Sequence, residues 1–329
     1  MIRPVPLSCA VLLALVLLPV SAARAKSSIR VAVADQSPAM FASPEWQALN
    51  LRRTRYFVPA DVMQDTAERL KARSYVKAAR AAGASTLLHI STADLRSKRG
   101  KRVSTRQYRR NVGRIVRYFR NLGVRDFGAW NEVNHKTQET WDSPGHAVSY
   151  FKSMYRAVKL GVGPPKACRG CAVVGLDVLD QAGVERYIRS FYKRLSRTWR
   201  KRLTIVGIHN YSDVNRSRSR GTSSIIRTVR RYNKRTKFWF TETGALASFG
   251  RSFPYSESRQ AARIRNMFTY ASRYRRSGVD RVYSYNWFGI ETGTSCGGRC
   301  RFDAGLVAAD GTPRPVYEAF RSKLRSYSR

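Results

Sequence analysis

Acidic residues are scarce in this sequence, and several familiar functional patterns are missing from it. Its 329 residues include 21 aspartates and glutamates against 62 lysines and arginines, so the formal net charge is +41 at pH 7. It contains no glycine-rich phosphate loop, zinc-binding histidine pair or calcium-binding loop, and we therefore expect no nucleotide, cofactor or catalytic metal. Internal repeats are absent too, which excludes a solenoid. The hydrophobic share of 43% is enough for a large core, so a soluble globular protein with a very basic surface is expected.

The N-terminus has the features of an export signal. Arg3 is followed by an apolar run from Leu7 to Val20, and Ala23-Arg24-Ala25 fits a small-x-small cleavage site. An uncleaved membrane anchor is the alternative, but the run is shorter than the roughly 20 residues that a membrane span needs. We therefore predict a signal peptide over residues 1–25, cleavage after Ala25, and a secreted or cell-envelope protein without a stable membrane anchor.

Four of the five cysteines follow the predicted signal peptide and form two local pairs. Two residues lie between Cys168 and Cys171, and three lie between Cys296 and Cys300. In an exported protein such pairs favour two disulfide bonds, and a four-thiolate zinc site is the alternative. The connectivity stays open from the sequence alone.

Apolar runs typical of strands alternate with segments of helical period along the remaining chain. The segment Ser104–Leu122, for example, places its apolar residues on one helical face and is followed by Gly123. Eight strand candidates in roughly 300 residues predict a single-domain (β/α)₈ barrel over residues 26–329. A doubly wound sheet is the alternative, but it would carry a glycine-rich turn after its first strand. The expected strands are Ile29–Asp35, Arg53–Ala60, Ser85–Ser91, Phe127–Glu132, Ala172–Val178, Leu203–Asn210, Lys237–Thr241 and Arg281–Trp287.

Two glutamates lie where an apolar strand gives way to a loop. Glu132 ends the fourth predicted strand and Glu242 follows the seventh. In a (β/α)₈ barrel the C-terminal strand ends carry the active site, and a buried carboxylate is costly unless it is paired or used. A structural ion pair with one of the many cations is the alternative for each glutamate.

These residues resemble the retaining glycoside hydrolases of clan A, of the family 5 and family 39 type. The matching segments are Asn131-Glu132, Glu242, His209-Asn210-Tyr211, Trp287 and Arg55. The run from Gly305 to Tyr317 resembles the clan's approach to the last helix. The sequence departs from the pattern at Val133, where these families often place a proline.

The resemblance implies a role for each matched residue. Glu242 would be the nucleophile, and Glu132 would be the acid/base, with its pKa raised by the neighbouring anion. Arg55 and Tyr211 would hold Glu242 ionised. The remaining matched residues would contact the substrate: Asn131 at the sugar 2-hydroxyl, Trp287 by stacking on the ring, and His209. Structural roles are the alternatives: Trp287 as a core aromatic, Arg55 as a counterion in the barrel wall and His209 as a core histidine. His89 and His135 receive no role.

Positive charge gathers in two segments that follow predicted strands. Arg96–Arg102 holds five cations in seven residues, and Val214–Gly221 holds three in eight. A basic rim would concentrate an anionic glycan near the active face, whereas an overall arginine bias would explain the charge without any ligand. The resemblance implies a carbohydrate partner, neutral or anionic. A nucleic acid is not expected, because the predicted signal peptide exports the chain and no nucleic-acid-binding motif is present.

Two functions remain open at this point. The first is a secreted glycosidase that cleaves O-glycosidic bonds of a poly- or oligosaccharide by a retaining mechanism, and that acts as a monomer. The second is a catalytically inactive barrel that binds an anionic cell-envelope polymer through its basic rim. Only the first requires Glu132 and Glu242 to lie close together.

Overall fold

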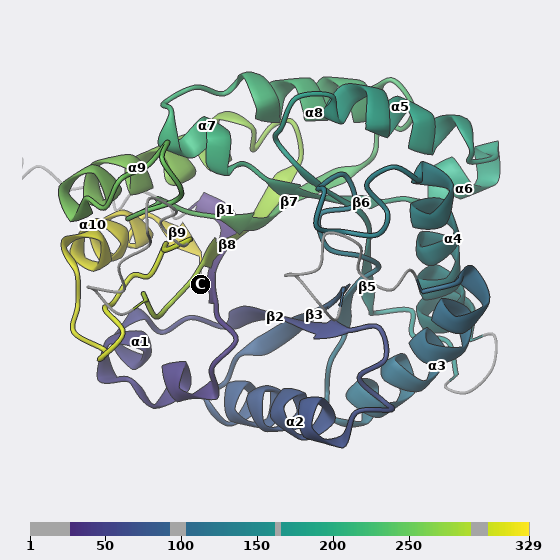
Figure 1. Cartoon of the computed structure of the whole chain (residues 1–329), viewed down its shortest axis with the longest axis horizontal. Coiled ribbons are helices and arrows are strands. Elements are labelled where there is room, and N and C mark those ends of the chain that lie inside the picture. The colour runs from purple at the N-terminus through teal and green to yellow at the C-terminus, as the bar shows by residue number, and fades with distance from the viewer. Residues whose placement is uncertain (1–26, 93–102, 162–165, 291–301, 329) are drawn as a thin grey trace, which may run out of the picture.

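The chain folds into a (β/α)₈ barrel, as a computed structural model shows (Figure 1). The structure describes residues 27–92, 103–161, 166–290 and 302–328. The strands pair in parallel in the order β2-β3-β4-β5-β6-β7-β8-β1, and β1 packs against β2 to bring the two ends of the sheet together. The strands are β1 Ser27–Ala34, β2 Arg53–Pro59, β3 Ser85–Ser91, β4 Asp126–Gly128, β5 Ala172–Leu179, β6 Ile205–His209, β7 Lys237–Thr243, β8 Val279–Tyr285 and the short outer strand β9 Tyr327–Ser328 beside β1.

Helices surround the barrel and cover its outer face (Figure 1). They are α1 Pro44–Leu49, α2 Thr66–Ala81, α3 Thr105–Asn121, α4 Pro144–Tyr155, α5 Val184–Lys193, α6 Arg197–Arg202, α7 Tyr211–Asn215, α8 Arg220–Arg230, α9 Glu257–Arg273 and α10 Pro315–Leu324, with a 3₁₀ turn at Pro38–Ala42 and a π turn at Arg156–Leu160. The expected helix at Ser104–Leu122 is α3. Its N-terminus is a capping box in which the Ser104 side chain accepts from Gln107 N and the Gln107 side chain accepts from Ser104 N.

The barrel interior is apolar at one level and polar at the next. Six buried residues fill its lower part: Ala32, Leu87, Val174, Ile205, Trp239 and Tyr283. Because side chains alternate across a strand, the residue two positions beyond Leu87 faces the interior again, nearer to the C-terminal end of β3. That residue is His89, which is completely buried. The apolar plug therefore supports a polar layer directly beneath the barrel mouth.

Some predicted boundaries were wrong at strand ends. β4 ends at Gly128 and not at Glu132, because Ala129 and Asn131 leave the regular ladder and donate single backbone bonds to Val174 and Ile90. β8 ends at Tyr285 and not at Trp287. The shortened β4 is followed by Asn131 and Glu132 of the candidate site, and β8 ends at Tyr285, which also lies there.

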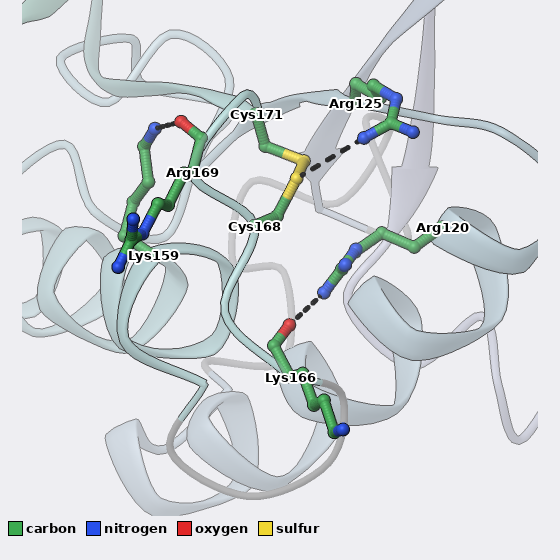
Figure 2. The surroundings of a disulfide bond; sticks show 7 residues. All are labelled: Arg120, Arg125, Lys159, Lys166, Cys168, Arg169 and Cys171. Atoms are coloured by element: carbon green, nitrogen blue, oxygen red, sulfur yellow. Dashed lines mark hydrogen bonds between the residues drawn. A yellow bond between two sulfur atoms is a disulfide. The ribbon is translucent and has the colours of Figure 1, made fainter.

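One of the two predicted disulfides is present. Cys168 is bonded to Cys171 just before β5, with their Cα atoms 5.3 Å apart. The Cys168 backbone N–H donates to Val158 O (2.8 Å), and Arg125 lies 3.8 Å from the Cys168 sulfur (Figure 2). A four-thiolate zinc site is excluded because these two sulfurs are bonded to each other. Cys296 and Cys300, like the predicted signal peptide, lie outside the described residues.

No helix in the described ranges combines the length and apolar character that a membrane crossing requires.

Candidate active site

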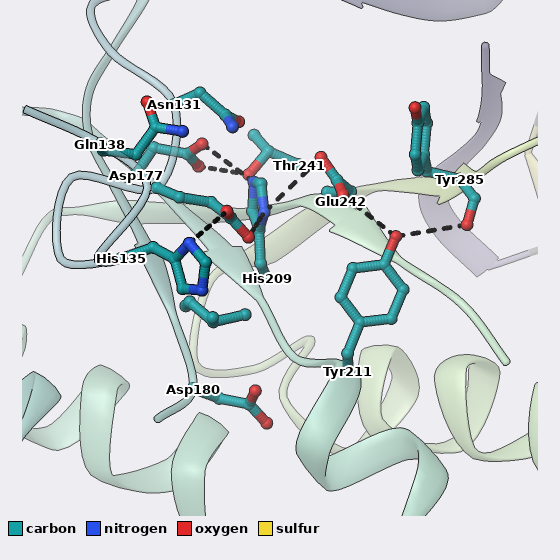
Figure 3. A network of polar contacts seen from close by, with 12 residues as sticks. Asn131, His135, Gln138, Asp177, Asp180, His209, Tyr211, Thr241, Glu242 and Tyr285 are labelled. Carbon is teal, nitrogen blue, oxygen red and sulfur yellow. Dashed lines mark hydrogen bonds and ion pairs between the residues drawn. The ribbon is translucent and has the colours of Figure 1, made fainter. Parts of the chain in front are cut away.

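Glu132 and Glu242 lie together at the C-terminal end of the barrel. Glu242, shown in Figure 3, belongs to β7, and Glu132 follows β4. A carboxylate oxygen of each residue and a ring nitrogen of His209 all lie within 4.8 Å of one another. The two carboxylates therefore face a common space at the barrel mouth, where the fold places catalytic groups.

Cationic and hydroxyl donors hold Glu242. Arg55 of β2 is completely buried, and its Nη1 donates to Glu242 Oε2 over 2.8 Å. The same guanidinium donates to Asn131 Oδ1 through Nη2. The Tyr211 hydroxyl lies 3.2 Å from Glu242 Oε1, and burial, followed by the Glu242 charge, raises the pKa of this tyrosine. Glu242 is thus held from two sides, by Arg55 and by Tyr211.

Glu132 has a histidine partner, and this changes the expected pKa. His209 Nδ1 lies 3.0 Å from Glu132 Oε1, and His135 Nδ1 lies 3.8 Å from Glu132 Oε2. Burial raises the pKa of Glu132, but the hydrogen bond and charge of His209 outweigh burial and leave the pKa below its usual value. The expectation that the neighbouring Glu242 raises this pKa was wrong, because a cation lies between the two carboxylates.

His209 is charged because a buried aspartate lies on its other side. Its Nε2 lies 2.9 Å from Asp177 Oδ2, and its Nδ1 lies 3.6 Å from Glu242 Oε2. Burial lowers the pKa of His209, but Asp177 and Glu242 outweigh burial and raise the pKa to about 10. The His209 imidazolium therefore lies among the carboxylates of Asp177, Glu132 and Glu242. It connects the buried Asp177 to the two glutamates at the barrel mouth.

Asp177 and His89 are parts of the site that the sequence analysis did not assign. Asp177 is completely buried in β5, accepts a hydrogen bond from Thr241, and lies 3.5 Å from His89 Nε2. His89 Nδ1 accepts from Arg55 Nε over 3.1 Å, and burial lowers the pKa of His89 to about 3. His89 is therefore neutral, with its proton on the nitrogen that faces Asp177. A charged residue inside an otherwise apolar strand was the signal that could have identified Asp177.

Two glycines make room for this buried layer. A Cβ on Gly207 of β6 would lie 1.7 Å from Asp177 Oδ1, and a Cβ on Gly128 of β4 would lie 1.8 Å from His89 Cδ2. No larger residue can occupy either position without displacing the side chain opposite. The glycines thus set the space in which Asp177 and His89 reach the interior.

Trp287 does not form part of the open site, so its predicted role as a stacking surface was wrong. The side chain has no exposed area and packs edge-on against Tyr317 of α10, with ring centroids 6.1 Å apart. It lies two residues beyond β8, where Asp35 fixes its backbone N–H over 2.9 Å. Tyr285, the last residue of β8, is only half-buried and lies beside Glu242 (Figure 3).

Glu132 has an unusual backbone conformation. Its φ angle is 43°, in the left-handed region that residues with a side chain rarely adopt. Such conformations cost of order 1–3 kcal/mol and concentrate at functional sites. The conformation turns the chain sharply after Asn131, which brings both side chains to the mouth.

Glu132, His209 and Glu242 also have the geometry of a metal site. The chemistry of the set is against this use, because the pKa of His209 is raised to about 10 and a metal would have to displace its proton. The imidazolium itself supplies the positive charge that a metal would bring.

Solved structures of other proteins share the fold of this chain. No family model matches the sequence, and neither does any curated protein sequence. Among solved structures, a GH5_18 protein from Bifidobacterium longum subsp. infantis is similar with a TM-score of 0.65 and 14% identity, over 91% of this chain and 79% of that one. A fungal β-1,4-galactanase has a TM-score of 0.60 and 14% identity (89% and 98%). Xylanase 10B from Thermotoga petrophila has a TM-score of 0.57 and 13% identity (91% and 94%). At these identities, the likeness shows that the chain shares its barrel with enzymes that act on glycans.

Proposed function

We propose that this protein is a retaining glycoside hydrolase that cleaves O-glycosidic bonds with Glu242 as nucleophile and Glu132 as acid/base. The observation that carries the proposal is the approach of the two carboxylates, whose oxygens come within 4.8 Å at the barrel mouth. Retaining hydrolysis needs carboxyl groups about 5–5.5 Å apart, whereas inverting enzymes leave about 6.5–9.5 Å for a water molecule. The barrel's likeness to a galactanase and a xylanase adds support.

The environment of each carboxylate suits its proposed role. Glu242, held by Arg55 and Tyr211, attacks the anomeric carbon, and the bond from that carbon to the leaving oxygen breaks. Glu132 delivers a proton to the departing oxygen. In the second step Glu132 takes a proton from water, and the water oxygen displaces Glu242 from the sugar.

The proton for the first step is stored on His209. Because Glu132 is ionised beside the imidazolium, the pair shares one proton, which passes from His209 Nδ1 to Glu132 Oε1 over 3.0 Å as the leaving oxygen becomes basic. Asp177 holds the histidine in place from the other side. The second step returns a proton along the same path.

Two further residues complete the substrate contacts. Because Arg55 donates to Asn131 Oδ1, the Asn131 Nδ2 group serves as the donor to the sugar 2-hydroxyl. Tyr285 presents its ring beside Glu242 and takes the stacking role first given to Trp287. Its backbone carbonyl is fixed 3.3 Å from the Tyr211 hydroxyl.

The cellular setting is part of the proposal. The disulfide between Cys168 and Cys171 supports an oxidising compartment, and the N-terminal pattern supports export with cleavage after Ala25. We propose that the mature protein acts there as a monomer on a carbohydrate.

Activity on a panel of aryl glycosides and polysaccharides tests the proposal. Glu242→Ala should abolish turnover of every substrate that the wild type cleaves. Glu132→Ala should still release an activated leaving group, and azide should restore its second step, because azide attacks the intermediate without a general base. Rescue confined to Glu242→Ala would reverse the two roles. No hydrolysis of any glycan would instead favour an inactive barrel that binds its ligand.

A further inference from the structure

A strongly basic hollow lies beside the candidate active site, between α5 and α8. Its volume is 730 Å³, and α5 and α8 pack side by side on the outside of the barrel (Figure 1). Five arginines from two helices and the loop between α7 and α8 line it: Arg186, Arg189, Arg218, Arg220 and Arg227. Two of them, Arg218 and Arg220, belong to the basic segment Val214–Gly221 noted in the sequence. The other basic segment, Arg96–Arg102, lies outside the described residues.

Three of these guanidinium groups are available to a ligand. Arg186, Arg220 and Arg227 are exposed, and within the described part of the chain none of them has a carboxylate at ion-pair distance. The other two are engaged. Arg189 lies 3.4 Å from Glu185, and Arg218 donates to the Ser212 hydroxyl over 2.7 Å. The hollow therefore presents unneutralised positive charge from two helices.

The acidic groups at the hollow already have partners. Glu185, which also lines it, accepts from the Ser224 hydroxyl and pairs with Arg189, whereas Asp180 and Asp213 accept from backbone donors. Asp180, which lines the hollow, is 6% exposed and accepts the backbone N–H groups of Ser212 (3.1 Å) and Asp213 (2.7 Å). Asp213 in turn accepts the N–H groups of Gly221 and Thr222 at the start of α8. Asp180 and Asp213 thus fix the loop between β6 and α8, which carries Arg218 and leads into Arg220. Neither carboxylate lies at ion-pair distance from Arg186, Arg220 or Arg227.

The hollow is connected to the candidate site through Asp180, which follows β5 and lines the hollow. The backbone N–H of Asp180 donates to the carbonyl of His209 over 2.9 Å, and Figure 3 shows Asp180 at the edge of the network that contains His209 and Tyr211. A glycan bound at Glu132 and Glu242 and continuing toward α5 and α8 would pass over this hollow.

We propose that the hollow binds an anionic group, a carboxylate, sulfate or phosphate, on the glycan chain that the active site holds, which makes the substrate an acidic glycan. The inference rests on the proposed function for the identity of the bound chain. Guanidinium groups suit this task because their planar N–H donors match the oxygens of such anions. Several in one hollow also raise the local concentration of an anionic ligand.

Binding of matched dextrans tests the proposal without any hydrolysis. The triple variant Arg186→Gln, Arg220→Gln, Arg227→Gln is compared with Arg106→Gln, Arg109→Gln, Arg110→Gln on the exposed surface of α3, which removes the same charge elsewhere. Affinities for carboxymethyl dextran, dextran sulfate, phosphorylated dextran and uncharged dextran are measured at one ionic strength. All six side chains are exposed, so the thermal transitions should match that of the wild type.

We expect the hollow variant to lose about tenfold or more in affinity for at least one anionic dextran. The α3 variant should lose less than about threefold, and the anion that shows the difference identifies the bound group. Equal losses in the two variants, or no loss in either, would overturn the proposal, because binding would then reflect only the overall charge. Hollow-dependent binding by a protein that hydrolyses no glycan would uphold the hollow and reject the proposed function. Hydrolysis of a glycan without hollow-dependent binding would uphold the proposed function and reject the hollow as a binding site.

Discussion

Asp177 controls the charge of the candidate site without reaching its surface. Its carboxylate contacts His209 and His89, and those two histidines outweigh burial and keep its pKa below the usual range. The same contact keeps His209 protonated up to a pH near 10. In the proposed mechanism Glu132 receives its proton from His209, so Asp177 would position that proton through His209 without contacting the substrate.

Replacing Asp177 with asparagine should therefore move the alkaline limit of activity. Without the anion, the raised pKa of His209 falls, and the proton is lost at lower pH. The alkaline limb of kcat/KM against pH should shift downward by about 1–3 units, the usual effect of one opposite charge at this distance. Asp126→Asn is the matched control. Asp126 is the first residue of β4, at the end of the strand that points away from the barrel mouth, and it forms an ion pair with Arg281. An unchanged alkaline limb in Asp177→Asn would contradict the role of His209 as proton store.

The left-handed backbone of Glu132 makes a separate prediction about stability. Both Glu132→Ala and Glu132→Gly remove the carboxylate, but glycine adopts a φ near 43° without the steric cost that a Cβ brings. The glycine variant should be more stable than the alanine variant by about 1 kcal/mol in denaturant unfolding. A less stable glycine variant would show that the conformation carries no strain.

At the scale of single elements, β6 must contain a glycine opposite Asp177. Gly207→Ala should lower the free energy of unfolding by about 1–3 kcal/mol, since its Cβ would lie 1.7 Å from the Asp177 carboxylate. Gly113→Ala in α3 is the control, because a Cβ there meets nothing within 4 Å and should stabilise the helix by about 0.5–1 kcal/mol. Urea titrations of both variants measure the difference. Equal effects at the two positions would mean that β6 accommodates the added Cβ without displacing Asp177.

The elements show which parts of the fold could be predicted from sequence. The strands were predictable because apolar runs with clear helical stripes between them identify a βα repeat, and β3 matched over its full predicted range, Ser85–Ser91. The ends of β4 and β8 were not. A segment that leaves the hydrogen-bonded sheet to form the barrel mouth has the same apolar residues as a strand. Phe127–Glu132 therefore resembled a strand over its full length. The role predicted for Trp287 was wrong for another reason: the sequence does not distinguish a tryptophan buried in the core from one that stacks on a sugar.

The site residues predicted from the sequence were those that follow or end a predicted strand, together with Arg55, which the family resemblance indicated within β2. Glu132, Glu242, Arg55, Asn131, His209 and Tyr211 were identified and lie together. Asp177 and His89 were not, because they lie within strands and their role depends on Gly207 and Gly128 in neighbouring strands. That pairing of a large polar residue with a glycine across the barrel exists only in three dimensions.

For the whole molecule, the charge of +41 sets a dependence on salt. Like charges repel over a Debye length of about 30 Å at 0.01 M ionic strength and about 8 Å at 0.15 M. Raising the salt concentration between these values should increase the Tm, because compaction of so many cations is penalised less. Sucrose at matched osmolarity controls for general solvent effects and leaves the charges unscreened. A Tm that falls with salt would show that local ion pairs outweigh the overall repulsion.

Covalent trapping of the nucleophile tests the central claim most directly. An aryl 2-deoxy-2-fluoro glycoside of whichever sugar the protein hydrolyses forms the glycosyl-enzyme quickly through its good leaving group, while the fluorine slows the release of the sugar. Mass spectrometry of the intact protein and of its peptides then locates the added sugar. We predict one sugar per chain, attached to Glu242 in the peptide that contains Thr241 and Thr243, and no attachment in Glu242→Gln. A sugar attached to Glu132, or turnover of the parent glycoside with no trapped sugar and with inverted anomeric configuration, would contradict the account.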